Sequence, residues 1–459
     1  MSKKELGKKA KSYTLAGTAW ANAWKTCAGA GALGMVASLA GMFVDAKRFG
    51  FSYLFAFVVF LTAALGSLFF ILINRLTSAG WSVTVRRVAE FFSAGLLVFP
   101  ILFIPIVLSM GNLYPWLSHG EHGEHAASST AALVPEAQAA QHGAPGSTPH
   151  APPALRAHPG ADARAEQGDA SEEANHIAHG NVLASKKAFL NKPFFLVRAA
   201  IYFAIWCWLG WTFLKLSTRQ DTTGDPKDTV AAQRIAHPAA FLFGVSLTFA
   251  MVDWVMSLEP SWFSTIFGVY LFAGSTVGGF AVLTFTLISL KETGPLKEMV
   301  NVEHLHDMGN LLFGFTSFWA YIAFSQYMLI WYAALPEETT YYHARGMGPA
   351  GGSWQTVSIG LIVLHFVVPF LMLISRQAKR RLGILKFGAA WLFVIHIADI
   401  YWFVLPNLTK EITPHWLDFT CLLGVGGLYL AAVFYFMSKH QLIPVSDPRL
   451  KRALTFEQV

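Results

Sequence analysis

The chain has 459 residues, of which 54% are hydrophobic and only 13% are charged, about half the charged fraction of an average soluble protein. This composition excludes a water-soluble globular protein and predicts an all-α, polytopic membrane protein. The formal net charge of +7 would suit a nucleic-acid-binding protein, but the lysines and arginines lie between apolar segments, so we expect no nucleic-acid partner.

Ten segments are long and apolar enough to cross a membrane, because a spanning helix needs about 20 mostly apolar residues. They are 26–44, 51–73, 90–110, 195–216, 238–258, 267–290, 311–333, 354–375, 384–405 and 417–437. We expect spans 2–5 and spans 6–9 to form two four-helix bundles. Spans 1 and 10 are then peripheral.

Lysine and arginine predict the orientation of these spans. If the N-terminus is cytoplasmic, 24 of the 34 Lys and Arg residues fall on the cytoplasmic side and 10 on the other. Cytoplasmic segments of membrane proteins carry the excess of positive charge. We therefore expect both termini to be cytoplasmic.

The predicted organisation has four parts. Residues 1–110 contain the cytoplasmic N-terminus and spans 1–3, and residues 195–437 contain spans 4–10. Residues 438–459 form a cytoplasmic tail. Residues 111–194 form an extracytoplasmic loop rich in His, Ala and Pro, which has too few large apolar residues to form a core and is expected to be largely disordered.

This loop contains "HGEHGEH", in which His119, His122 and His125 are three residues apart. In a helix, that spacing would place the three imidazoles on one face, where they could bind a divalent metal ion. The other interpretation is a solvated linker without metal.

Elsewhere, Cys27, Cys207 and Cys421 form no CxxC or CxxCH motif, which excludes covalent c-type haem and iron–sulfur clusters held by this chain alone.

Ionisable residues inside spans are candidates for function, because they are costly in a bilayer. In span five, Ser246, Asp253 and Ser257 share one helical face, and Glu259 follows about 9 Å further along the axis. The residues predict the outer part of a proton path. Alternatively, Asp253 is a hydrogen-bonded carboxyl that joins two helices.

Spans eight and nine carry the deepest candidates. His396 and Asp399 are three residues apart on span nine, where a carboxylate beside an imidazole can pass a proton or bind a quinone carbonyl. Their alternative role is a buried polar pair between helices. His365 lies near the middle of span eight and is either a third relay group or a packed core histidine.

Span seven begins with "EHLHDMGNLLFGF", which gathers Glu303, His304, His306 and Asp307 at its cytoplasmic mouth. The cluster predicts a site of proton uptake from the inside. The alternative is an interfacial helix start, where acidic residues are favoured by the helix dipole.

Two other classes of function stay open at this point. His365 and His396 could be the axial ligands of one b-type haem in a quinol dehydrogenase subunit. The bulky neighbours Leu364, Phe366 and Ile395 argue against that pocket. A secondary transporter would require helices broken at the midplane, and no clear unwound pair occurs.

Three stretches resemble the F-type membrane subunit of bacterial alternative complex III. They are "HPAAFLFGVSLTFAMVDWVMSLEPSWFSTIFGVYLFAGS", "HDMGNLLFGFTSFWAYIAFSQYMLIWYAALPEETTYY" and "SAGWSVTVRRVAEFF". The resemblance covers nearly the whole chain except the loop 111–194. It implies a subunit of the polysulfide-reductase type in the bacterial inner membrane, with two four-helix bundles and no cofactor of its own.

The same resemblance implies the partners. Quinol oxidation belongs to a homologous C-type membrane subunit beneath an iron–sulfur subunit, and electrons continue to c-type haems on cytochrome subunits and to a terminal oxidase. The F-type subunit is then structural and a proton conductor, without redox chemistry of its own. On this hypothesis, protons pass from His304, His306 and Asp307 through His365, His396 and Asp399 to Asp253 and Glu259.

Overall fold

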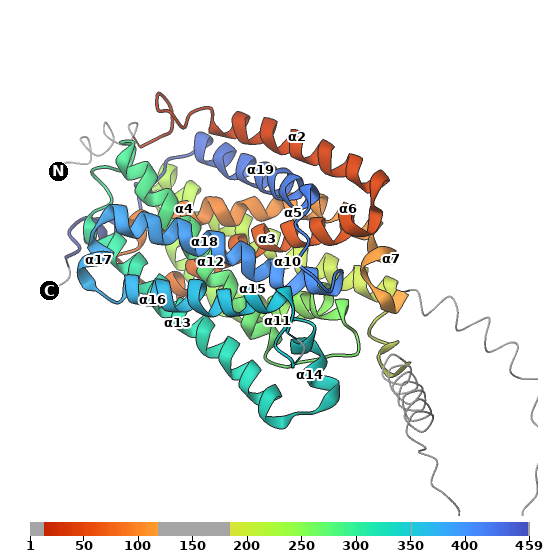
Figure 1. Cartoon of the computed structure of the whole chain (residues 1–459). Coiled ribbons are helices and arrows are strands. Elements are labelled where there is room, and N and C mark those ends of the chain that lie inside the picture. Colours follow the sequence, from red (N-terminus) through yellow and green to blue (C-terminus); the bar gives the residue numbers. More distant parts are fainter. Residues whose placement is uncertain (1–12, 118–183, 350, 458–459) are drawn as a thin grey trace, which may run out of the picture. The chain divides into compact units, whose positions relative to one another are not determined.

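A computed structural model describes residues 13–117, 184–349 and 351–457 of the chain (Figure 1). Every regular element in these ranges is a helix, and they contain no strand, which confirms the all-α prediction. Most of the predicted loop 111–194, including His119, His122 and His125, lies outside the described residues. We describe the helical body, residues 13–114 and 195–457, on its own.

Nine helical segments of the described chain are long and apolar enough to cross a membrane. They are α2 (Ala23–Val44), α3 (Ala46–Leu76), the segment Val83–Leu108, α10 (Lys192–Thr223), α11 (Lys227–Trp254) with η2 (Met256–Leu258), α12 (Phe267–Glu292), the segment Ser353–Leu373, α18 (Leu382–Val404) with η4 (Leu405–Asn407), and α19 (Trp416–Lys439). Each coincides with a predicted span. The chain is therefore a multi-pass membrane protein.

Two of these segments are interrupted. Val83–Leu108 consists of α4 (Val83–Ala94), η1 (Gly95–Val98), α5 (Phe99–Leu102) and α6 (Ile104–Leu108), and prolines at 100 and 105 explain the breaks. Ser353–Leu373 consists of α15 (Ser353–Leu361), the π-helical turn η3 (Ile362–Val367) and α16 (Val368–Leu373). The shorter helices are α7 (Met110–Leu113), α14 (Pro336–His343), α17 (Arg376–Arg380) and α20 (Leu450–Leu454).

The predicted span 311–333 lies in α13 (Val302–Ala333), which is not among the nine apolar segments. Its 32 residues make it about 48 Å long, ample for a crossing. Serine, glutamine, tyrosine and tryptophan side chains dilute its apolar character. Its second half is exposed: Tyr321, Phe324 and Tyr332 are 66%, 62% and 83% accessible.

The centre of the body is formed by α3 and α12. Nearly every residue of α3 from Arg48 to Arg75 is buried. The two backbones touch at glycines, because a Cβ at Gly66 would lie 2.0 Å from the backbone oxygen of Ser275. Helix α4 packs mainly on α3 and α13 on α12, whereas α11 packs equally on both and α18 packs on α12 and, to a smaller extent, on α3. This arrangement is compatible with two four-helix bundles that meet at α3 and α12.

Helices α2 and α19 pair at the edge of the body (Figure 1). The sequence predicted that spans 1 and 10 are peripheral, but not that they pair. A Cβ at Gly31 or Gly34 of α2 would lie 2.5 Å from backbone nitrogens of α19. The small residues therefore let the two backbones approach closely, as is common between membrane helices.

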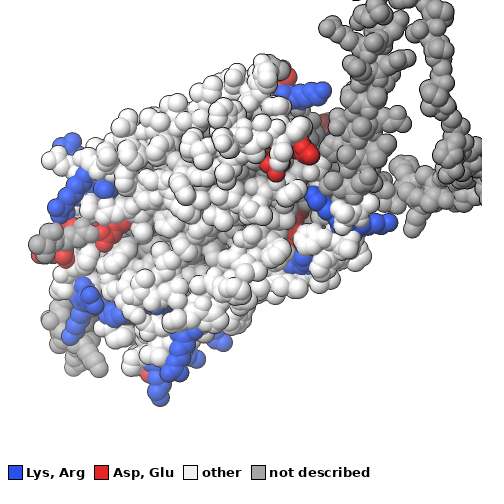
Figure 2. Space-filling view, turned by 90° about the horizontal axis from the view of Figure 1, so that it is seen from below, with Lys and Arg blue, Asp and Glu red and all other residues white. Residues whose placement is uncertain are grey.

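Both described chain ends lie at one end of the body, which we call the basic end. There the backbone N–H of Leu442 donates to Tyr13 O at 2.9 Å, and the amide of Asn301 donates to Phe456 O at 2.9 Å. At the opposite end, Arg48 donates to Asp418 at 2.6 Å. On the face in Figure 2, the charged side chains of the described residues gather mainly toward the two ends. Both ends of the described chain thus lie at the same end of the helical body.

Candidate functional site

The first candidate is a buried group at membrane depth that we call the central cluster: Thr62, Trp319, His365, His396 and Asp399. His396, on α18, contacts Thr62 of α3, with 2.9 Å between Nε2 and Oγ1. The Thr62 hydroxyl donates to Val58 O at 2.7 Å, so it accepts from His396. The proton of a neutral His396 is therefore on Nε2, and Nδ1 has no hydrogen-bond partner.

Asp399 lies one turn further along α18 and is also buried. Its Oδ2 accepts a hydrogen bond of 3.0 Å from Nε1 of Trp319 on α13, and its Oδ1 has no partner. A Cβ at Gly274 of α12 would lie 3.3 Å from Asp399 Oδ2 and 3.8 Å from His396 Nδ1. Both side chains therefore face α12, as their predicted common face required.

His365 lies in the π-helical turn η3 and is fully buried. Its imidazole packs against the indole of Trp319, with 3.8 Å between ring centroids and 31° between planes. Neither ring nitrogen has a hydrogen-bond partner. Trp319 thus connects His365 to Asp399. Single-turn π-helices inside α-helices often occur at functional sites.

Four buried polar atoms of the central cluster have no hydrogen-bond partner: His365 Nδ1 and Nε2, His396 Nδ1 and Asp399 Oδ1. Oγ1 of Thr316, one turn before Trp319 on α13, is a fifth such atom. An unsatisfied buried polar atom costs about 1–3 kcal/mol. A set of them that includes titratable groups is typical of a functional site rather than a packed core. Chemically, the two imidazoles and the carboxyl can each take up and release a proton.

An apolar cavity of about 430 Å³ lies beside the cluster. Trp319 lines it together with Tyr270, Tyr327, Tyr342, Ser358 and Trp402. The hydroxyl of Tyr342 is buried without a well-formed hydrogen bond. Burial raises the pKa of this phenol, which lies in α14 outside the spans, so its hydroxyl stays protonated. The cavity therefore offers aromatic walls with a small number of polar groups.

Asp253 occupies a different place in the body. Arg198 of α10 donates to both of its carboxyl oxygens at 2.8 Å, and the Tyr202 hydroxyl donates at 2.7 Å. Asp253 therefore joins α10 to α11, and its contacts share no residue with the central cluster. Glu259 is half-buried just after η2. Burial raises the pKa of the nearby Tyr341 phenol, and the negative charge of Glu259 raises it further. Ser246 is buried and accepts from Trp206 at 2.9 Å.

The acidic and histidine residues predicted at the mouth of α13 lie at the basic end. Glu303 forms an ion pair with Arg380 at 2.8 Å, and His304 bonds the C-terminal segment at Ala453 O. His306 Nδ1 lies 3.9 Å from Asp307 Oδ1. The structure does not bring these four residues into contact with the central cluster.

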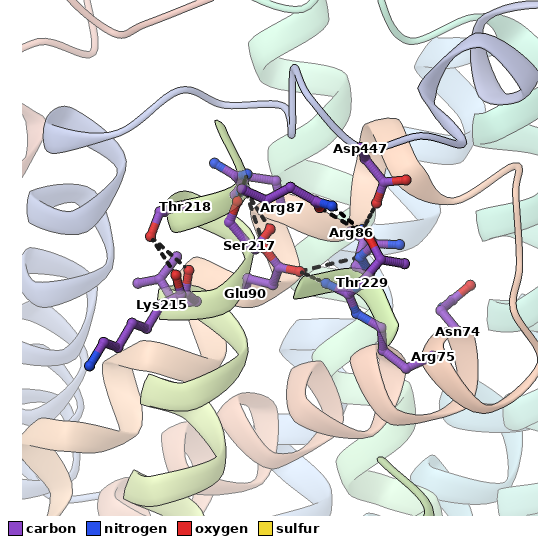
Figure 3. Close-up of polar contacts among 12 residues, drawn as sticks. Asn74, Arg75, Arg86, Arg87, Glu90, Lys215, Ser217, Thr218, Thr229 and Asp447 are labelled. Atoms are coloured by element: carbon purple, nitrogen blue, oxygen red, sulfur yellow. Dashed lines mark hydrogen bonds and ion pairs between the residues drawn. The ribbon is translucent and has the colours of Figure 1, made fainter. Parts of the chain in front are cut away.

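A second candidate, the arginine cluster, was not predicted (Figure 3). Arg75, Arg86 and Arg87 lie between the predicted spans 51–73 and 90–110, and the sequence analysis counted them only among the 24 cytoplasmic Lys and Arg residues. All three are buried, Arg75 at the end of α3 and the other two in α4. Glu90, one turn after them in "RRVAE", accepts from Arg75 at 3.1 Å and from Arg86 at 3.2 Å.

Segments distant in sequence complete the arginine cluster. Arg87 donates to both oxygens of Asp221 on α10, at 2.7 and 3.1 Å, and to Gln441 O at 3.1 Å. Arg86 donates to Asp447 at 2.7 Å. The i, i+4 spacing of Arg86 and Glu90 could have predicted an ion pair in this helix. No sequence pattern indicated that Asp221 and Asp447 would join them.

The described residues contain no group of three or more His, Cys, Asp or Glu side chains able to hold a metal ion. Cys27, Cys207 and Cys421 are free thiols. No protein-family model matches the chain, and no curated protein matches it. The similarity to the F-type subunits of alternative complex III therefore stays a prediction.

Proposed function

We propose that the chain is a membrane subunit of a respiratory quinol:cytochrome c (or quinol:oxidase) oxidoreductase complex and that it conducts protons without binding a redox cofactor. The observation that carries the proton-conducting role is the central cluster. Two imidazoles and a carboxyl are buried there with atoms that have no hydrogen-bond partner. Such groups can change protonation during turnover.

The geometry indicates at which atoms each group of the central cluster can take up or release a proton. His396 can take up a proton on Nδ1 and release one from Nε2 toward Thr62. Asp399 can take up a proton on Oδ1 while Oδ2 accepts the hydrogen bond from Trp319 Nε1. His365 can exchange a proton at either nitrogen. Water would have to connect these atoms at the moment of transfer.

The inner part of the path follows α13. His306 and Asp307 lie at the basic end, Asn310 is one turn deeper, and the unpartnered Thr316 hydroxyl is one turn before Trp319. About 9 Å of helix separates Asn310 from Thr316, a distance that water must cover. We assign the outer part to Glu259 rather than to Asp253, because Arg198 and Tyr202 already satisfy the Asp253 carboxyl.

The proposed partners are those implied by the resemblance: a homologous C-type membrane subunit, an iron–sulfur subunit and c-type cytochrome subunits, with quinol oxidised on them. The proposed orientation places the basic end in the bacterial cytoplasm. The excess of Lys and Arg on that side supports it.

A second candidate function is quinone binding, predicted at His396 and Asp399. The cavity lined by Trp319 and Tyr342 favours a flat, membrane-soluble ring more than the cluster itself does. Trp319 lines that cavity, whereas Asp399 does not, and the Trp319 indole donates a hydrogen bond to Asp399. Photoaffinity labelling by a quinone analogue should then mark α13 or α14 around Tyr342, and labelling confined to the partner subunits would exclude this candidate.

The test uses the whole complex. Mass spectrometry of the complex purified in mild detergent should find multihaem cytochrome c and iron–sulfur subunits with this chain. In liposomes, Asp399→Asn should lower the number of protons moved per electron, whereas Asp253→Asn should not. Equal ratios for Asp399→Asn and the unmodified complex would leave only a structural role.

A further inference from the structure

The arginine cluster contains more positive charge than its carboxylates balance. Four guanidinium groups meet there, those of Arg75, Arg86, Arg87 and Arg449, and they face the three carboxylates of Glu90, Asp221 and Asp447. Within the part of the chain that the structure describes, one of these four cations therefore has no counter-charge. A buried charge without compensation is strongly unfavourable.

The excess can be located on particular atoms. Arg87 donates to Asp221, Ser217 and Gln441 and is satisfied. By contrast, Arg75 Nε and Nη1, Arg86 Nη1 and the three side-chain nitrogens of Arg449 are buried and form no hydrogen bond with another described residue, although Arg449 Nε lies 3.6 Å from Asp447 Oδ1. Arg75 and Arg86 are 1% and 0% exposed, so bulk water does not solvate them.

These unsatisfied donors belong to one place. Arg75 and Arg86 donate to the same oxygen, Oε1 of Glu90. Arg86 and Arg449 both pair with Asp447, at 2.7 and 3.6 Å. Burial, and then the neighbouring Arg86 cation, lowers the pKa of the Arg449 guanidinium, although Asp447 acts in the opposite direction. Figure 3 shows Arg75, Arg86 and Asp447 in this common region.

We propose that the arginine cluster binds a phosphate group between α3, α4 and the C-terminal segment 441–457. Planar guanidinium groups match phosphate oxygens with paired hydrogen bonds, and a phosphate would supply both the acceptors and the missing negative charge. The Arg449 side chain is 18% exposed, so this part of the cluster lies next to the surface of the basic end. Basic pockets between membrane helices on the cytoplasmic side are known to take lipid head groups.

Two sources could supply this phosphate, an anionic lipid head group or free phosphate, and one experiment separates them. The full-length chain is purified in phosphate-free buffer, and its Tm is measured with added inorganic phosphate. Its Tm is also measured in nanodiscs of phosphatidylcholine with and without phosphatidylglycerol. Phosphate that raises Tm identifies the free ion, whereas a rise with phosphatidylglycerol alone identifies the lipid.

Matched variants locate the site. Arg449→Gln removes the three buried nitrogens of the N-cap residue of α20, whereas Arg452→Gln removes an exposed arginine from within that short helix. We expect Arg449→Gln to weaken binding of the stabilising anion at least about tenfold, because hydrogen bonds to charged groups are strong. Arg452→Gln should bind like the unmodified chain.

Two results would overturn the proposal. The first is an unmodified chain that neither anion stabilises and that carries no phosphorus by elemental analysis after purification. The second is equal binding by Arg449→Gln and Arg452→Gln. If Arg449→Gln fails to fold, Arg75→Gln and the phosphorus content of the unmodified chain decide the question, because Arg75 carries two of the unsatisfied nitrogens.

Discussion

The indole of Trp319 on α13 donates a hydrogen bond of 3.0 Å to Asp399 on α18, 80 residues later in the chain. The same indole packs on His365 at 3.8 Å between ring centroids. One side chain therefore fixes two titratable groups from different helices, and it also lines the neighbouring cavity. The proposed proton path depends on this contact.

Trp319→Phe tests the contact directly. The phenyl ring can still pack on His365, but Asp399 Oδ2 loses its hydrogen-bond donor, which leaves neither carboxyl oxygen with a partner. We expect a loss of about 1–3 kcal/mol in unfolding free energy and fewer protons moved per electron. Trp331→Phe is the matched control, because Trp331 lies on the same helix and is 66% exposed. Identical Tm values and proton ratios for the two variants would remove Trp319 from the path.

Gly278→Ala tests the position of His396. An added Cβ would lie 2.6 Å from Cδ2 of the imidazole, so the ring would have to leave Thr62. Overpacking of this kind should lower the unfolding free energy by about 1–3 kcal/mol, measured by thermal unfolding. Gly244→Ala, with no atom within 4 Å of the new Cβ, should leave Tm unchanged or raise it. A Gly278→Ala protein as stable as the unmodified one would mean that the imidazole lies elsewhere.

Local patterns predicted the helices well, because hydropathy and chain length act within one segment. The predicted span 311–333 is an exception. Its helix, α13, forms, but polar and aromatic residues make it less apolar than the nine segments that could cross a membrane. The common face of His396 and Asp399 was also predictable, since a three-residue spacing fixes it.

Long-range partners were not predictable from the sequence. Arg198, counted with the positive charges flanking the long loop, is the partner of Asp253 at a separation of 55 residues. Arg86 meets Asp447 across 361 residues. A lone carboxylate in an apolar run has the same appearance whether a distant arginine neutralises it or not. Packing between helices makes that difference, and single-segment patterns do not contain it.

Asp253→Asn separates a structural carboxylate from a conducting one. The change removes one partner of the buried Arg198–Asp253 ion pair, so we expect a loss of about 3–5 kcal/mol in unfolding free energy. The double change Arg198→Met with Asp253→Leu removes both charges and should be less destabilised than either single variant. Assembled complexes with Asp253→Asn should keep their proton-to-electron ratio. A ratio that falls without a loss of Tm would return Asp253 to the path.

His304 should make the attachment of the C-terminal segment depend on pH. Its Nδ1 accepts from the backbone N–H of Asn301 at 3.1 Å, while its Nε2 donates to Ala453 O at 3.0 Å. Only a neutral imidazole can do both. His304 precedes the crossing part 311–333 of α13, and burial lowers its pKa from the ordinary 6.5 to about 4.

The sign of the effect follows from this difference. Because the unfolded chain binds the proton more readily, the contribution of His304 to stability is complete above pH 6.5 and is lost as the pH falls toward 4. The Tm difference between the unmodified chain and His304→Gln should therefore shrink between pH 7 and pH 5. His237→Gln, at an exposed histidine, should show no such trend. A constant difference across this range would mean that His304 does not hold the C-terminal segment in its neutral form.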